Sequence, residues 1–360
     1  MNLLIFIGAL AAFIILHELG HLVACLVLKI DVEEFGIGFP PRIFIFFRWR
    51  GIDFTLNWIL LGGFVNPAGQ NDPEIAGGLA ASAPWKRLVV YFAGPVMNII
   101  VAVLLYTLAV SQMGMPETKK VIVVDVAPNS PAEQAGLKAD DLLLRINGQP
   151  LEGVNVVQGI VAVNKGKEIT LEVQRAGQII EVKLVPRADP PPGQGAIGIA
   201  MSNPTKPISL INAFPLGTMA VVDQGYLLLT LPMKFFQGSV PAEEMRVVGF
   251  KGMYDIYQGV RDIEASQKQT RGVGTLAFFA MISASLGILN LMPIPALDGG
   301  RILFTLPELL IRRRVPAHLE NTLHMVGFML LLVLLVYVNL QDFINPVNMM
   351  TTPVSITPTP

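Results

Sequence analysis

Residues 3 to 28 form an almost unbroken apolar run close to the start of the chain. The run is longer than the roughly 20 residues that a helix needs to cross the hydrocarbon core of a bilayer. Three ionisable residues interrupt it, His17, Glu18 and His21, and they make the pattern H-E-x-x-H. Ionisable side chains are costly inside a membrane, so this group predicts a functional site. The alternative is a buried polar cluster that packs helices together.

The residue types and their spacing point to a metal. Residues i and i+4 share one face of a helix, so the imidazoles of His17 and His21 can bind the same ion. Glu18 lies beside them, where it can act as general base on a water molecule that the metal activates. A zinc ion in a hydrolase has three nitrogen or oxygen ligands from the protein and one open position. The sequence therefore predicts a zinc site that needs one more ligand.

Asp298 is the candidate for that ligand. It follows an apolar segment that breaks at Pro293 and Pro295, and an acid at membrane depth is hard to explain without a cation. Asn290, eight residues earlier, is a candidate for holding the substrate backbone or polarising its carbonyl group.

Composition places the chain among membrane proteins, since 52% of its 360 residues are hydrophobic and 15% are charged. The net charge of -1 gives no indication of a nucleic-acid partner. The single cysteine, Cys25, lies in the first apolar run and is expected to be a small core residue. The N-terminal run lacks the positively charged start of a secretory signal peptide, so it is expected to be an uncleaved span.

The predicted fold is a polytopic α-helical membrane protein of about four transmembrane helices, with a membrane-associated β-hairpin region and an inserted α+β PDZ domain. The spans are expected near residues 3–28, 88–110, 276–297 and 323–340. The predicted organisation is a membrane core in residues 1–112, a PDZ domain in 116–201, a linker in 202–275, a second part of the membrane core in 276–345 and a disordered tail in 346–360.

Two segments have a special relation to the membrane. Residues 31–69 are rich in aromatic and β-branched residues and predict strands, and the part from Ile52 to Val65 is apolar enough to dip into the bilayer. Residues 208–236 are apolar but contain Pro215, Asp223 and Pro232. They are expected to form a helix on or partly in the membrane, although a crossing helix is also compatible with them.

Three other polar side chains in or near the spans give a weaker indication of function. Asn98 fits either a helix–helix hydrogen bond or a role in the site. His318 and His324 flank the start of the last span and are expected to be interfacial residues. Residues 238–274 allow no structural assignment.

The fragment of residues 127–151 resembles a PDZ domain. The resembling features are Ser130-Pro131-Ala132, Ala135-Gly136-Leu137, Asp140-Asp141 and the turn Ile146-Asn147-Gly148. PDZ domains bind peptides by adding a strand to a sheet edge, so a peptide or protein segment is an expected partner. Gly195 to Ile199 is a candidate for the loop that binds the peptide carboxylate.

Basic residues predict the orientation. They gather in the links between the first two and the last two spans, and neither terminus carries one. Short basic links face the cytoplasm. We therefore expect a multi-pass protein of the bacterial inner membrane, with both termini and the PDZ domain on the extracytoplasmic side.

Three motifs in order resemble the site-2 protease family of intramembrane zinc metalloproteases, in particular the bacterial branch with one PDZ domain, of the type that regulates sigma-factor proteolysis. They are HELGH at 17–21, FAGPVMN at 92–98 and LNLMPIPALDGG at 289–300. The resemblance implies that His17, His21 and Asp298 bind Zn²⁺ and that Glu18 is catalytic. It also implies that Asn290 and the re-entrant β-loop residues Gly62, Gly63, Phe64 and Val65 bind substrate.

The resemblance implies cleavage of single-span membrane proteins within or near the bilayer, for example anti-sigma factors or remnant signal peptides. One departure is VVGFKGMYDIY at 247–257, where relatives often carry a G-P-x-G-I-type stretch. A competing hypothesis is a non-catalytic PDZ adaptor with a structural metal, which would need four closing ligands. Another is a metal transporter, which would show repeated ligand sets.

Overall fold

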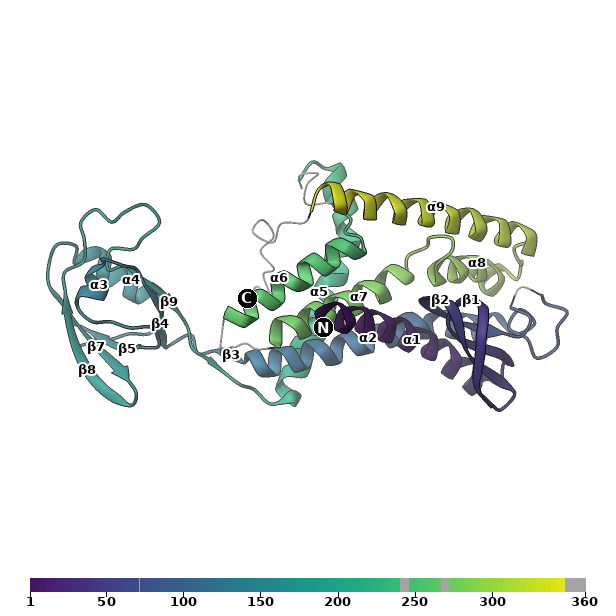
Figure 1. The fold of residues 1–360 in the computed structure, drawn as a ribbon, viewed down its shortest axis with the longest axis horizontal. Helices are drawn as coiled ribbons and strands as arrows, with labels where there is room; N and C mark the ends of the chain where they lie inside the picture. Colours follow the sequence, from purple (N-terminus) through teal and green to yellow (C-terminus); the bar gives the residue numbers. More distant parts are fainter. Residues whose placement is uncertain (71, 240–245, 267–271, 347–360) are drawn as a thin grey trace. The chain divides into compact units, whose positions relative to one another are not determined.

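The computed structural model describes residues 1–70, 72–239, 246–266 and 272–346 (Figure 1). They divide into two compact units, one made of residues 1–110 and 210–360 and the other of residues 111–209. We call the first the membrane unit and the second the inserted unit. From residue 347 on, the expected disordered tail lies outside the described residues.

Five helices of the described chain are long and apolar enough to cross a membrane. Four of them overlap the expected spans, and the fifth, α5, overlaps the segment expected on or partly in the membrane. They are α1 (Asn2–Leu28), α2 (Pro84–Met113), α5 (Leu210–Phe236), α7 (Val273–Asn290) and α9 (Ala317–Ile344). Length and composition leave the number of crossings a prediction.

Helix α5 packs against two of the other spans. Gly217 lies so close to α2 that a Cβ there would be 2.6 Å from the Thr107 hydroxyl. Gln224 donates to the Ser285 hydroxyl of α7 at 2.8 Å and accepts from the Tyr106 hydroxyl of α2 at 3.0 Å. A half-buried amide with partners on two neighbouring helices fixes where α5 docks.

The end of α7 differs from the sequence prediction. The span was expected to continue to Leu297, but α7 ends at Asn290, because Pro293 and Pro295 cannot continue a helix. Residues 291–297 form a loop, and a further helix, α8 (Asp298–Ile311), begins at the predicted ligand itself.

The polar stretch that allowed no assignment contains the helix α6 (Phe250–Ser266). Its aromatic residues face the start of α1, where the Phe6 ring lies 5.3 Å from the ring of Phe250 and 5.6 Å from that of Tyr257. Glu264, near the end of α6, accepts hydrogen bonds from the Thr275 backbone N–H and hydroxyl. An amphipathic helix is therefore pinned across α1 and α7.

The aromatic segment after α1 forms two long antiparallel strands, β1 (Val32–Trp49) and β2 (Ile52–Pro67). Both strands bend, so that Phe35 in the first half of β1 pairs with Phe54 in the first half of β2 and with Val65 in the second half. Residues 34–37 thus lie between the two halves of β2. The expected strands are present, as one curled hairpin.

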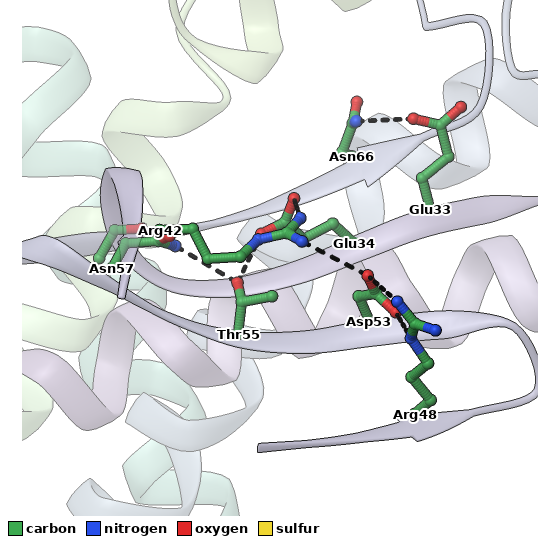
Figure 2. Close-up of polar contacts among 9 residues, drawn as sticks. Glu33, Glu34, Arg42, Arg48, Asp53, Thr55, Asn57 and Asn66 are labelled. Carbon is green, nitrogen blue, oxygen red and sulfur yellow. Dashed lines mark hydrogen bonds and ion pairs between the residues drawn. The ribbon is translucent and has the colours of Figure 1, made fainter. Parts of the chain in front are cut away.

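Charged side chains tie three neighbouring segments of this hairpin together (Figure 2). Glu34 accepts from Arg42 and from the Thr55 hydroxyl, both at 2.6 Å. Arg48 pairs with Asp53 at 2.6 Å. Cross-strand ion pairs and hydrogen bonds of this kind stabilise a register, here that of the curled region.

The inserted unit contains an antiparallel sheet in which five strands follow the order β8-β7-β5-β4-β9, and a sixth strand, β6, pairs with β5. Two short helices accompany it, and a small separate ladder, β3 with β10, joins the two ends of the unit. The elements are β3 (Met115–Pro116), β4 (Val121–Val126), α3 (Pro131–Gln134), β5 (Leu142–Ile146), β6 (Gln149–Pro150), α4 (Val154–Val163), β7 (Ile169–Arg175), β8 (Gln178–Leu184), β9 (Ile199–Ser202) and β10 (Thr205–Lys206).

The residues that resemble a PDZ domain have local structural roles. Ser130 caps α3 by accepting from the Glu133 backbone N–H at 3.1 Å. Buried Asp141 accepts two hydrogen bonds from Arg175, at 2.6 and 2.7 Å. Burial alone would raise the pKa of Asp141, but the hydrogen bonds from Arg175 and the Lys138 backbone outweigh it and hold the pKa below its ordinary value. The acid therefore stays charged and fastens β7 to the turn before β5.

Candidate metal centre

Two histidines face each other on α1. His17 and His21 lie one helical turn apart, both 8% exposed, and their Nε2 atoms are 3.2 Å apart. Sequence spacing alone accounts for this, because residues i and i+4 of a helix are neighbours. Two buried imidazoles with their Nε2 atoms converging form two corners of a metal site.

Asp298 supplies the third corner from the start of α8. Its Oδ2 atom lies 3.1 Å from His17 Nε2 and 3.3 Å from His21 Nε2. Ligand atoms of these three residues all lie within 4.8 Å of one another. The structure thus brings together the three ligands predicted from the sequence. No fourth Cys, His, Asp or Glu joins this group in the described chain, which is unlike a closed structural zinc site.

The outer ring nitrogens of the histidines have partners on α2. His21 Nδ1 lies 2.7 Å from the Val90 carbonyl oxygen, which can only accept, so Nδ1 carries the proton. His17 Nδ1 lies 3.5 Å from the side-chain amide of Asn98, whose Oδ1 is buried and has no partner among the described residues. Amide oxygen and nitrogen are assigned from their hydrogen bonds, and exchanging them lets the Asn98 oxygen accept from a protonated His17 Nδ1. Both Nε2 atoms then remain for a metal, so the residues fit zinc.

Gly94 on α2 makes room for the site. A Cβ at this position would overlap His21 Nε2 and lie 2.8 Å from His17 Nε2. A glycine in a helix allows the close approach of a neighbouring helix. The structure shows a close approach, in which the bare helix backbone forms one wall of the metal centre.

Glu18 lies between the ligands and the curled hairpin. Its Oε2 accepts from the Val65 backbone N–H at 3.1 Å. Gly63 also faces it, since a Cβ there would be 3.3 Å from Glu18 Cγ. The second half of β2 therefore runs past the carboxylate that the sequence predicts as the general base.

The remaining predicted site residues fall into two groups. Gly62, Gly63, Phe64 and Val65 all lie in β2, and Gly62 has φ = +103°, a conformation that favours glycine. Asn290 is the last residue of α7, and its side chain donates to the Leu286 carbonyl oxygen at 2.9 Å. The structure therefore brings β2 to Glu18, while Asn290 makes its hydrogen bond within its own helix.

Two further side chains were assigned from the sequence, and one of them has an additional contact near the site. Cys25 is fully buried, as expected for a core residue. His324 was expected to be a plain interfacial residue, but it accepts a hydrogen bond from the Ala296 backbone N–H, two residues before Asp298. The Val90 carbonyl group was missed altogether, because a backbone partner has no signature in a sequence.

Known proteins match almost the whole chain. The sequence profile of Peptidase family M50 matches residues 5–334. A Clostridium perfringens protein named "Putative zinc metalloprotease" is 31% identical over 94% of this chain and 97% of its own. A Nostoc protein of the same name is 30% identical over 95% and 96%.

Among solved structures, the PDZ domain of an SdrC-like protein from Listeria monocytogenes is 21% identical, with a TM-score of 0.21. The match covers 23% of this chain and 87% of that domain. The profile match, with the relatives in support, shows that the chain belongs to Peptidase family M50 and is a zinc metalloprotease of the site-2 protease type.

Proposed function

We propose that this protein hydrolyses peptide bonds within or near the transmembrane segment of single-span membrane proteins, at a zinc ion held by His17, His21 and Asp298. The observation that carries the proposal is the cluster of three ligand atoms within 4.8 Å of one another, set among long apolar helices. An open three-ligand site at that place serves hydrolysis of a membrane-embedded substrate. Anti-sigma factors and remnant signal peptides are the substrate types to try first.

When bound, zinc supplies a Lewis acid that polarises the scissile carbonyl group and makes water a better nucleophile. Residues of the protein orient the metal ligands and transfer the proton. The Val90 carbonyl group and Asn98 hold the two imidazoles in the tautomer that leaves Nε2 free. Glu18 takes a proton from water as general base and returns it to the leaving amine.

The hairpin explains how a helical substrate becomes cleavable. Peptide bonds in a transmembrane helix are shielded by their own hydrogen bonds, so the substrate must unwind first. Residues 63–67 of β2 pair with β1 on one side, and no described strand pairs with their other side. An unwound substrate added there as a strand would lie beside Glu18. Gly62, Gly63, Phe64 and Val65 would contact it, and Asn290 would hold its backbone.

The inserted unit has its own place in this proposal. Strand β9 is at one edge of the sheet, directly after the candidate carboxylate-binding loop of residues 195–199. A peptide or protein segment would bind there as an added strand. The distribution of basic residues supports a location in the bacterial inner membrane, with this unit and both termini outside the cytoplasm.

Purified full-length protein in liposomes with a single-span substrate tests the function. We expect cleavage at a bond that mass spectrometry locates within the apolar segment or a few residues from its end. A zinc chelator is expected to stop the reaction, and added zinc to restore it. Cleavage confined to soluble loops of the substrate would contradict the intramembrane proposal, and activity that survives complete removal of zinc would contradict the proposed metal centre.

A further inference from the structure

The loop that presents Asp298 is held in an unfavourable backbone conformation. Ala296, two residues before the ligand, has φ = +80°. An L-residue with a side chain pays a steric cost in this left-handed region. Such conformations persist where the surrounding structure enforces them, and they gather at functional sites.

A side chain from α9 enforces this one. His324 Nδ1 accepts a hydrogen bond from the Ala296 backbone N–H at 2.8 Å. The ring packs edge-on against Phe304 of α8, with 5.5 Å between centroids. Because Nδ1 accepts, the ring proton is on Nε2, which is buried and has no hydrogen-bond partner in the described chain. The hydrogen bond from Ala296 is therefore the one that the His324 ring makes within the described chain.

A second contact lies one turn along α9. Gly327 lies so close to the loop that a Cβ there would be 2.6 Å from the Pro295 carbonyl oxygen and 2.7 Å from its Cβ. Positions 324 and 327 share one face of the helix, since residues i and i+3 are neighbours. The helix thus contacts two successive residues of the loop, one through a side chain and one through its backbone.

These contacts stand out because α9 makes few others. Only 6% of its most apolar 18-residue window is buried. Its other main attachment is at the far end, where Asn339 and Asp342 accept backbone hydrogen bonds from Phe250 and Gly252 at the start of α6. Among the described residues, helix α9 therefore joins the rest of the membrane unit mainly at two places, and one of them is the loop before Asp298.

We propose that α9 braces this loop and that His324 is a positioning residue for Asp298. The inference rests on the proposed zinc site. With a single residue between them, a shift of Ala296 moves the start of α8 and with it the carboxylate. Metal–ligand distances in protein sites fall within about 0.2 Å of their standard values, so a displaced carboxylate binds less well. Mutation of a partner that holds a ligand in place typically weakens metal binding by about 10–100-fold. We expect the loss of the His324 hydrogen bond to weaken zinc binding by an amount in this range.

Zinc affinity of the purified full-length protein, measured by competition with a chromophoric chelator, tests the inference. His324→Leu keeps the bulk of the side chain but cannot accept the hydrogen bond, and we expect about tenfold weaker binding. His324→Asn places an amide oxygen at the position of Nδ1 and is expected to bind within about threefold of the wild type. The matched control is His318→Leu on an exposed position of the same helix, with unchanged affinity expected.

Cobalt(II) absorption gives a second readout. Its ligand-field bands report the geometry around the metal, and we expect them to change in His324→Leu and to return in His324→Asn. Gly327→Ala presses on Pro295 without altering a polar group, so it is a second way to disturb the loop. It should also weaken zinc binding, even if His324→Leu is poorly folded.

The outcomes separate this inference from the proposed function. If His17→Ala binds zinc as tightly as the wild type, the proposed metal centre is wrong. If His17→Ala loses zinc while His324→Leu and Gly327→Ala keep wild-type affinity, the metal centre stands and the brace is wrong. The brace is also wrong if His318→Leu is weakened as much as His324→Leu, or if His324→Asn restores nothing.

Discussion

Replacing Glu18 by glutamine is expected to slow peptide cleavage by roughly 10²–10⁴-fold while zinc content stays at the wild-type level. Glutamine has the same length and can still accept the hydrogen bond from the Val65 backbone N–H. It cannot take a proton from water, so only the general-base step is lost. Zinc content by mass spectrometry and single-turnover cleavage in liposomes measure the two effects on the same preparation.

The matched control is Glu74→Gln, the same change at an exposed position of the loop before α2. It is expected to leave both quantities unaltered. Wild-type cleavage by the Glu18→Gln variant would mean that another group is the base. A variant that loses its zinc would instead assign Glu18 to the stability of the metal centre.

Adding one methyl group at Gly94 is expected to remove zinc binding and activity together. In Gly94→Ala, the new Cβ would overlap His21 Nε2 and come within 2.8 Å of His17 Nε2. The two imidazoles must turn away or α1 and α2 must separate, and either movement spoils the ligand geometry. We expect zinc affinity to fall by more than the roughly 10–100-fold that follows loss of an outer partner of a ligand.

Gly8→Ala is the matched control for this change. Gly8 lies on α1, and a Cβ there would meet no atom within 4 Å. Equilibrium dialysis of both variants compares their zinc affinities, and circular dichroism compares their helix content. Gly94→Ala with normal zinc affinity would show that α2 does not form the wall of the site.

Much of the membrane unit could be predicted from its sequence, because apolar segments long enough to cross a bilayer have a strong signal. The ligand pair on α1 also followed from local spacing, since four residues bring His17 to His21. Asp298 was recognisable as an acid at a break in an apolar segment. In each case a short stretch of sequence carries the information.

Features that depend on distant segments were not predictable in this way. The curl of the hairpin arises because residues 34–37 pair with both halves of β2, and no local sequence pattern predicts that register. Helix α6 was not predicted because its sequence is polar overall. Its aromatic residues pack against Phe6 of α1, a contact between segments far apart in the sequence. The contact of His324 with Ala296 is a single hydrogen bond to a backbone group, and backbone groups are the same in every residue.

Zinc K-edge X-ray absorption of the purified full-length protein tests the central claim most directly. The account predicts one zinc ion per chain, surrounded by two imidazole nitrogens and by oxygen ligands at about 2.0–2.2 Å, without sulfur. A sulfur ligand at about 2.3 Å would point to Cys25 and contradict the assignment. A shell with fewer than two imidazoles, or a protein without zinc, would contradict it as well.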